Sequence, residues 1–128
     1  MTDEASFTRY FSKFIASKWK GPGFVFEAKY VKEGDKLSLS KIPEHQLRSL
    51  RMAKSNTGLY HKISDESRVR KPFDGFFIKK ADNAYIVCYF YEYKKFGMID
   101  ISEFDAILAH NPYKRSLSCD DFDLVFEV

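Results

Sequence analysis

Glu27 and Lys29 stand two residues apart in the alternating segment from Phe24 to Tyr30, and this pair could act on a phosphate ester. Successive side chains of a strand point to opposite faces, so Glu27 and Lys29 share a face, about 6.5–7 Å apart along the strand. The carboxylate could hold a divalent metal ion, while the ammonium group orients an attacking water or stabilises negative charge on a phosphate. A solvated strand face without chemistry offers the same tripeptide.

The elements that would position this pair begin with an amphipathic helix over residues 3–20, in which Asp3 can cap the first turn. The glycines and proline of residues 21–23 end that helix, and the strand over 24–30 follows. A second helix is expected from Ser40, with Pro43 in its first turn, to about Lys54.

The rest of the chain predicts further strands and a third helix. The helix begins at Ser102, with Ser102 and Asp105 as a cap-like pair, and stops before Pro112. The strands are expected over residues 37–39, 59–63, 76–78, 84–93, 96–101 and 122–126. Repeats and linkers are absent from the sequence, so we expect one domain over residues 1–128, of the α+β class, with a central mixed sheet flanked by helices.

The sequence around the pair resembles the PD-(D/E)XK nuclease superfamily, and within it the RecU-type Holliday junction resolvases. These proteins carry a strand ending in an E-A-K motif, followed by a helix that opens with H-Q. Here the E-A-K motif is residues 27–29 and the H-Q motif is His45 and Gln46. A looser similarity extends over residues 24 to about 108.

The resemblance implies a restriction-endonuclease-like fold and a homodimer that cuts branched DNA, in DNA recombination or repair, with Mg²⁺ or Mn²⁺ as cofactor. By position, Glu27 is similar to the family's metal-binding acid and Lys29 to its catalytic lysine. Gln46 matches the glutamine that supports the site, and His45 is its neighbour.

One acid that the family carries is missing from this sequence. The family places an aspartate on the strand before E-x-K, and residues 20–26 contain no acid. Asp74, in a Pro-x-Asp context, could supply a migrated metal ligand, and Glu4 resembles a helix-borne acid that some resolvases add. Asp74 could instead cap an Asp-Gly turn, and Glu4 could be an ordinary acid of a first helical turn.

A second arrangement of the same motif competes with the first. Asp74, followed at a distance by Glu92 and Lys94, also spells the superfamily pattern, with Glu92 and Lys94 expected on one strand face. No H-Q helix follows Lys94, so we place Glu27 and Lys29 first.

The charges are unevenly distributed along the chain. Residues 29–80 contain thirteen Lys or Arg against six Asp or Glu, although the net charge is only +3. This segment predicts a face that binds a polyanion, or else a solvated mixed surface. The side chains expected to contact phosphates, interleaved with aromatic residues, are Lys62, Arg68, Arg70 and Lys71.

Composition excludes several other classes of protein. No apolar run approaches the ~20 residues of a membrane span. Cys88 and Cys119 do not indicate a disulfide framework, and Cys88, within an apolar run, indicates a buried thiol, so we expect a cytoplasmic protein. The sequence therefore predicts a metal-dependent, structure-selective DNA endonuclease, with Glu27, Lys29, Gln46 and Asp74 in the site and Glu4 as a further metal ligand. The alternative is a module of the same fold that binds nucleic acid or protein without cutting.

Overall fold

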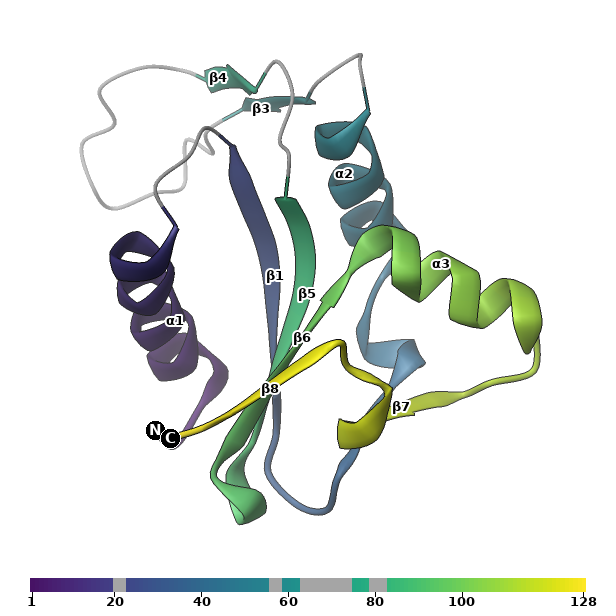
Figure 1. Ribbon diagram of the computed structural model, residues 1–128. Coiled ribbons are helices and arrows are strands. Elements are labelled where there is room, and N and C mark those ends of the chain that lie inside the picture. The colour runs from purple at the N-terminus through teal and green to yellow at the C-terminus, as the bar shows by residue number, and fades with distance from the viewer. Residues whose placement is uncertain (20–22, 56–58, 63–74, 79–82) are drawn as a thin grey trace.

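The computed structural model describes residues 1–19, 23–55, 59–62, 75–78 and 83–128, and its centre is a mixed sheet of four strands (Figure 1). Across the sheet the order is β1 (Phe24–Val31), β5 (Asn83–Phe90), β6 (Lys95–Asp100) and β8 (Leu124–Glu127). β1 runs parallel to β5, and the two remaining pairings are antiparallel. The α+β class and the mixed sheet are therefore confirmed.

Three helices cover the two faces of the sheet. α1 (Glu4–Lys18) lies on one face, and α2 (Glu44–Lys54) and α3 (Ile101–His110) lie on the other (Figure 1). The core under α1 is rich in aromatic rings, which include Phe7, Phe11, Tyr89 and Phe96. The core under α2 and α3 is mainly aliphatic and includes Leu47, Leu50, Ile86, Ile99 and Phe104.

α1 forms because its apolar residues recur at helical spacing and its first turn is capped. Asp3 accepts a hydrogen bond from the backbone N–H of Ser6 at 2.8 Å, and the Ser6 hydroxyl accepts one from the backbone N–H of Asp3, which completes a capping box. Phe7 then stacks on Tyr89 of the sheet, with ring centroids 5.5 Å apart. The predicted cap is confirmed, and the helix ends at Lys18 rather than at residue 20.

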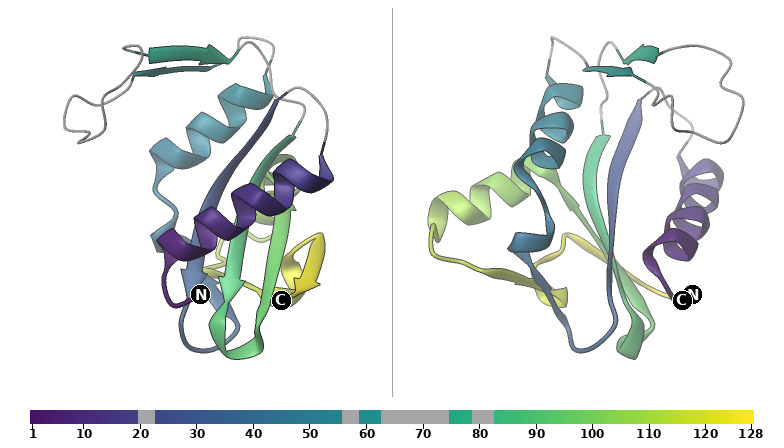
Figure 2. Two further views of the ribbon diagram at one scale, coloured as in Figure 1. Left: turned by 90° about the vertical axis from the view of Figure 1, so that its left-hand side faces the viewer. Right: turned by 180° about the vertical axis from the view of Figure 1, so that it is seen from behind.

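β1 alternates as the sequence predicts. Phe26 and Ala28 face the core under α1, whereas Val25 and Val31 pack against the core under α2. β1 is also an edge of the four-stranded sheet, since β5 is its only strand partner among the described residues. Seen from behind, β1 runs between α1 on one side and α2 on the other (Figure 2).

The segment after β5 corrects a prediction that bears on the site. The strand expected over 84–93 ends at Phe90, and residues 91–93 form a short 3-10 helix, Tyr91–Tyr93. Lys94 follows with a φ of 50°, in the left-handed region, which turns the chain into β6. Glu92 and Lys94 thus do not share a strand face, so the placement expected for the competing arrangement of the motif is wrong.

Two helix starts also differ from the sequence-based expectation. α3 begins at Ile101, and its cap is Asp100, which accepts from the backbone N–H of Ser102, so the predicted Ser102–Asp105 cap is wrong. α2 begins at Glu44 with Pro43 in the N-cap position, because a separate 3-10 turn, Leu39–Lys41, takes up the residues before it.

The remaining elements are short. β2 (Lys36–Ser38) pairs with β7 (Ser116–Ser118), a strand that the sequence did not predict. β3 (Leu59–Lys62) pairs with β4 (Gly75–Ile78). A 3-10 turn, Cys119–Asp121, leads toward β8. Phe122 therefore lies before the last strand rather than in it, and it is buried against Phe90.

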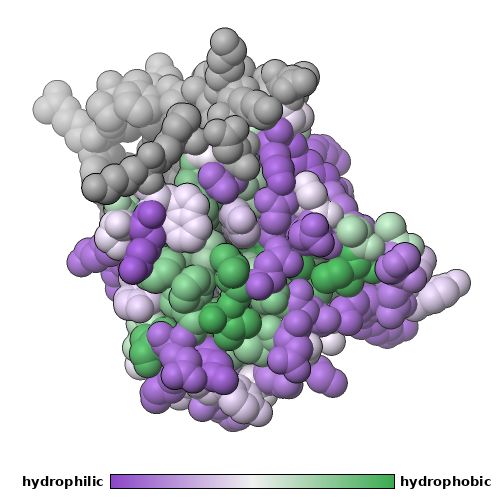
Figure 3. Space-filling view, viewed as in Figure 1, coloured by the Kyte–Doolittle hydropathy of each residue, from purple (hydrophilic) through white to green (hydrophobic). Residues whose placement is uncertain are grey.

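The sheet edge opposite β1 is formed by β8. Leu124 and Val125 of this strand are about two-fifths exposed, at 41% and 43%. Hydrophobic side chains gather at the centre of the face over which β8 runs (Figure 3). The two edges of the sheet thus differ, because charged side chains project from β1 whereas apolar ones are exposed along β8.

Candidate functional site

Lys29 is placed by β1 on the face that packs against α2, and it is buried. Its exposed fraction is 7%, and it is the one buried charged side chain among those that the structure describes. Within that part of the chain, no carboxylate forms an ion pair with it. Burying most of a charged side chain without a paired carboxylate is costly. Lys29 is therefore a position where the protein carries a charge that folding alone does not favour.

Glu27 lies on the same face of β1, half-buried, at the centre of a group of charges. Burial raises the pKa of the Glu27 carboxyl above its ordinary value, and the nearby charge of Glu4 raises it further, while Lys29 and His45 act to lower this pKa. Groups from α1, β1 and α2 thus lie close enough to act electrostatically on one carboxyl. Such gatherings are typical of functional sites.

Gln46 comes to this side of the sheet from the first turn of α2. Its side-chain oxygen, Oε1, is buried and has no hydrogen-bond partner among the residues that the structure describes. A buried acceptor without a donor costs free energy, so an orphaned atom of this kind needs an explanation. It is an oxygen that a water, an ammonium group or a metal-bound water could satisfy.

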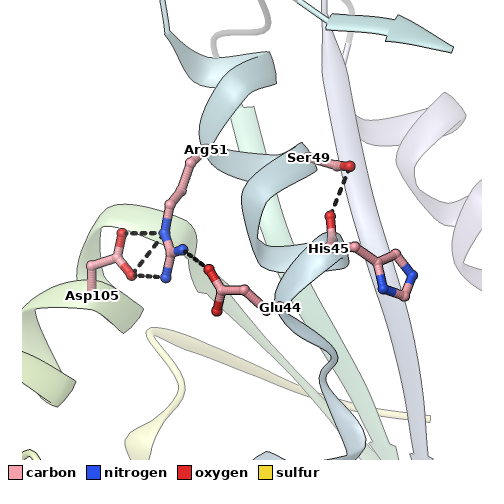
Figure 4. Close-up of polar contacts among 5 residues, drawn as sticks. All are labelled: Glu44, His45, Ser49, Arg51 and Asp105. Carbon is pink, nitrogen blue, oxygen red and sulfur yellow. Dashed lines mark hydrogen bonds and ion pairs between the residues drawn. The ribbon is translucent and has the colours of Figure 1, made fainter.

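The opposite side of α2 is fixed to α3 by an arginine (Figure 4). Arg51 Nε donates to Asp105 Oδ2 at 3.0 Å and Nη2 donates to Oδ1 at 2.8 Å, while Nη1 reaches Glu44 Oε1 at 3.0 Å. The imidazole of His45 extends on the other side of the helix, toward β1 (Figure 4). The Arg51 contacts therefore hold α2 on its side toward α3, with the His45 imidazole on the side toward β1.

A second contact holds the C-terminal end of α2. Lys54 Nζ donates to both carboxylate oxygens of Asp100 at 2.7 Å, and to the Ser102 hydroxyl at 3.2 Å. Asp100 is also the N-cap of α3, so one carboxylate joins the end of α2 to the start of α3. Both contacts set the position of α2 against the sheet and hence of Gln46 beside β1.

The described donors fit a hard divalent cation in type. Glu27 and Glu4 supply carboxylate oxygens, and Gln46 supplies an amide oxygen, which are the donors that Mg²⁺ prefers. Among the described residues, however, no three His, Cys, Asp or Glu side chains are grouped to hold a metal ion. Mg²⁺ commonly binds through one or two carboxylates and retains waters, so the donors present fit a partly hydrated ion.

Several predicted site residues cannot be placed. Asp74, Arg68, Arg70 and Lys71 lie outside the described residues, and Lys62 belongs to β3, where only the backbone is described. The structure thus gathers the charges of Lys29 and Glu4 around Glu27, and α2, which carries Gln46, contacts the same strand. The sequence pattern alone did not indicate that the charge of His45, which is exposed on α2, also acts on Glu27.

One feature of the site was missed at the sequence level. An open cavity of about 530 Å³ lies beside the C-terminal end of β1 and the start of α1. Lys32, Lys36 and Lys41 line it, together with Glu4, whose charge acts on Glu27. The signal was the lysine-rich stretch that follows the strand, but only the fold brings it beside α1.

Comparison of the chain with protein-family models, with curated proteins and with solved structures finds no match. None of the helices in the described ranges has the length and hydrophobicity needed to cross a bilayer.

Proposed function

We propose that this protein is a Mg²⁺- or Mn²⁺-dependent, structure-selective DNA endonuclease of the PD-(D/E)XK type that hydrolyses phosphodiester bonds in branched DNA such as Holliday junctions. The observation that carries the proposal is the buried side chain of Lys29, two residues from half-buried Glu27 on the face of β1 that packs against α2, the helix that carries Gln46. The restriction-endonuclease-like fold is part of the proposal.

Stability alone does not account for this arrangement. Lys29 is buried without a carboxylate partner in the described part of the chain, burial raises the pKa of Glu27, and Gln46 retains an orphaned acceptor. Each feature costs free energy of folding. Proteins keep such locally unfavourable groups mainly at functional sites, so their concentration around one strand supports chemistry there.

The roles follow from the chemistry of each group. Glu27, with Asp74 or Glu4 as the second acid, would hold the metal ion, which would polarise the phosphate and activate water when bound. The ammonium group of Lys29 would orient the attacking water and stabilise negative charge on the phosphate. The Oε1 atom of Gln46 would accept a hydrogen bond from Lys29 or from water and so position the donor.

Binding of DNA would come mainly from basic side chains outside this cluster. Lys62, Arg68, Arg70 and Lys71 remain the proposed phosphate contacts of the basic segment. Contacts of this kind position the DNA without reading its sequence, which suits an enzyme that recognises the structure of a junction.

A module that binds DNA or protein without cutting is the second candidate. It is favoured by the lack of a three-ligand metal group within the described residues and by the absence of the upstream acid in residues 20–26. Where the module binds DNA, the two candidates predict the same binding and differ in cleavage.

The deciding experiment incubates the purified protein with four-way junction, nicked duplex and single-stranded DNA in Mg²⁺, in Mn²⁺ and in EDTA. We expect cleavage that is strongest on the junction, requires either metal and stops in EDTA. Junction binding without cleavage in either metal would instead support the binding module. Cleavage that persists in EDTA would exclude the metal-dependent enzyme.

The homodimer and the cytoplasmic location also belong to the proposal, and they rest on the resemblance and on cysteine usage. A symmetric junction contains paired scissile strands, so two copies would place two sites on one substrate. Sedimentation of the protein with and without junction DNA tests this directly. A monomer in both conditions would contradict the dimer.

A further inference from the structure

The open cavity beside β1 shares one residue, Glu4, with the candidate site. Glu4 lines this cavity, and its charge also acts on Glu27. Lys32, another lining residue, follows Lys29 by three positions, which is about 10 Å along extended chain. A polymer whose reacting group lies at Lys29 would therefore continue into the cavity.

The basic side chains of the cavity form no ion pairs with the described residues, unlike three other bases of the protein. In the described part of the chain, ion pairs within 4.0 Å hold Arg51, Lys54 and Lys114. Under the same criterion, no carboxylate of that part holds any of the three lysines that line the cavity, Lys32, Lys36 and Lys41. These three lysines are exposed, and none of them joins two elements of the described fold through an ion pair.

Two of the three acids that line the cavity have other roles, and the third, Glu33, is exposed. Asp3 is engaged as the cap of α1, where its carboxylate accepts from the backbone N–H of Ser6 at 2.8 Å. Glu4 belongs to the candidate site, and Glu33 lies in the turn between β1 and β2, where it is exposed. The cavity thus has three unpaired ammonium groups against one acid, Glu33, without a structural or site role.

We propose that this cavity binds the sugar–phosphate backbone of the DNA strand that passes through the site, with Lys32, Lys36 and Lys41 as its phosphate contacts. This inference rests on the proposed function and adds three phosphate contacts to those proposed for Lys62, Arg68, Arg70 and Lys71. Ammonium groups on flexible stems suit a backbone whose position varies, because each acts as a point charge rather than a fixed fork.

The test measures affinity for junction DNA by fluorescence anisotropy in EDTA, over a series of NaCl concentrations, so that cleavage plays no part. The double variant Lys36→Gln/Lys41→Gln removes two of the three charges. If each lysine neutralises one duplex phosphate, the slope of log affinity against log salt falls in magnitude by about 1.8. The matched control, Lys13→Gln/Lys18→Gln, removes two exposed charges of α1 that do not line the cavity, and its slope should equal that of the wild type.

A variant of opposite sign separates this effect from loss of folding. Glu33→Gln removes an acid from the cavity wall and should tighten binding, whereas Glu103→Gln, on the exposed face of α3, should leave affinity unchanged. A damaged fold would weaken binding, so tighter binding with Glu33→Gln cannot arise from misfolding.

The failure of this inference differs from the failure of the proposed function. Equal salt slopes for the wild type and Lys36→Gln/Lys41→Gln would overturn the cavity as a DNA site, even where the wild type cleaves junctions with metal. Reduced slopes without any metal-dependent cleavage would support the cavity and contradict the nuclease. A wild type with no measurable DNA affinity would overturn both.

Discussion

Glu27 and Lys29 leave the same face of β1 two residues apart, and the lysine is the more deeply buried of the two. Burial raises the pKa of the Glu27 carboxyl, and the charge of Lys29 acts against that rise. Lys29 therefore offsets part of the cost of charging Glu27, while its own side chain is buried without a carboxylate partner among the described residues. This relationship predicts a conflict between stability and activity.

Replacing Lys29 with methionine should raise stability and abolish cleavage. Methionine keeps the unbranched shape of the stem and removes a buried charge, so we expect the free energy of unfolding to rise by about 1 kcal/mol. Urea denaturation measures this change, and junction cleavage measures the loss of activity. Lys13→Met, at an exposed position of α1, is the control and should stay within about ±0.5 kcal/mol. A less stable Lys29→Met protein would mean that the ammonium group has a stabilising partner.

Glu27→Gln should abolish cleavage and spare affinity for the junction. The substitution keeps the shape of the side chain but removes the charge that would hold the metal, whereas phosphate binding depends on the basic side chains. Affinity may be measured in EDTA and cleavage in Mg²⁺ on the same substrate. Asp74→Asn should be inactive as well if Asp74 is the second metal ligand.

Glu92→Gln is the matched control for that experiment. Glu92 is exposed in the short 3-10 helix after β5, away from a shared strand face with Lys94. We expect a change in stability within about ±0.5 kcal/mol and no change in the cleavage rate. Loss of cleavage in Glu92→Gln with full activity in Glu27→Gln would reverse our assignment of the motif.

Local pattern was sufficient to predict much of the scaffold. The strict alternation around Glu27 predicted both the strand and the face that Glu27 shares with Lys29, because side-chain direction in a strand depends only on position. The cap at Asp3 was equally local, since its partner Ser6 is three residues away. The resemblance pointed to Glu4, whose charge the fold brings to bear on Glu27.

Features that depend on distant pairing were not predicted. The contact of Arg51 with Asp105 joins residues 54 positions apart, and without it Asp105 was assigned to a helix cap. The end of β5 at Phe90 was missed because the alternation of tyrosines continues to Tyr93, whereas the left-handed turn at Lys94 determines where the hairpin reverses. Tertiary context decided the outcome in both places.

Arg51→Met should loosen the attachment of α2 and affect the site indirectly. The guanidinium group joins Asp105 of α3 and Glu44 of α2, and all three side chains are partly exposed, so we expect a loss of about 1 kcal/mol in the free energy of unfolding. The cleavage rate should also fall, because the same helix carries Gln46. Arg48→Met, on an exposed position of the same helix, should change neither quantity. Equal stability of the two variants would show that the Arg51 contacts contribute nothing.

The cap of α1 should give a defined pH dependence. Hydrogen bonds from the backbone and side chain of Ser6 lower the pKa of Asp3 below its ordinary value of 3.8. The stabilisation is therefore fully present above the unfolded-state pKa and is lost as pH falls through the lower folded-state pKa. Asp3→Asn keeps a capping oxygen without the charge, so the wild type should be more stable at pH 6, and the difference should disappear at low pH. A difference that is constant with pH, measured by urea denaturation, would contradict this.

Gly97 of β6 should tolerate no side chain, because Phe122 fills the space beside it. A Cβ atom at residue 97 would lie 2.5 Å from Cγ and 2.8 Å from Cβ of Phe122, which is buried. We expect Gly97→Ala to cost about 1–3 kcal/mol of unfolding free energy, and to cost less in a Phe122→Ala background, where most of the ring is gone. Gly34→Ala is the control: its Cβ would meet nothing within 4 Å, although its φ of 78° makes the substitution strained. The strain from Gly34→Ala should be the same in the wild-type and Phe122→Ala backgrounds, so its coupling energy to Phe122 should be near zero. A double-mutant cycle that gives Gly97→Ala the same coupling energy to Phe122 as Gly34→Ala would contradict the steric explanation.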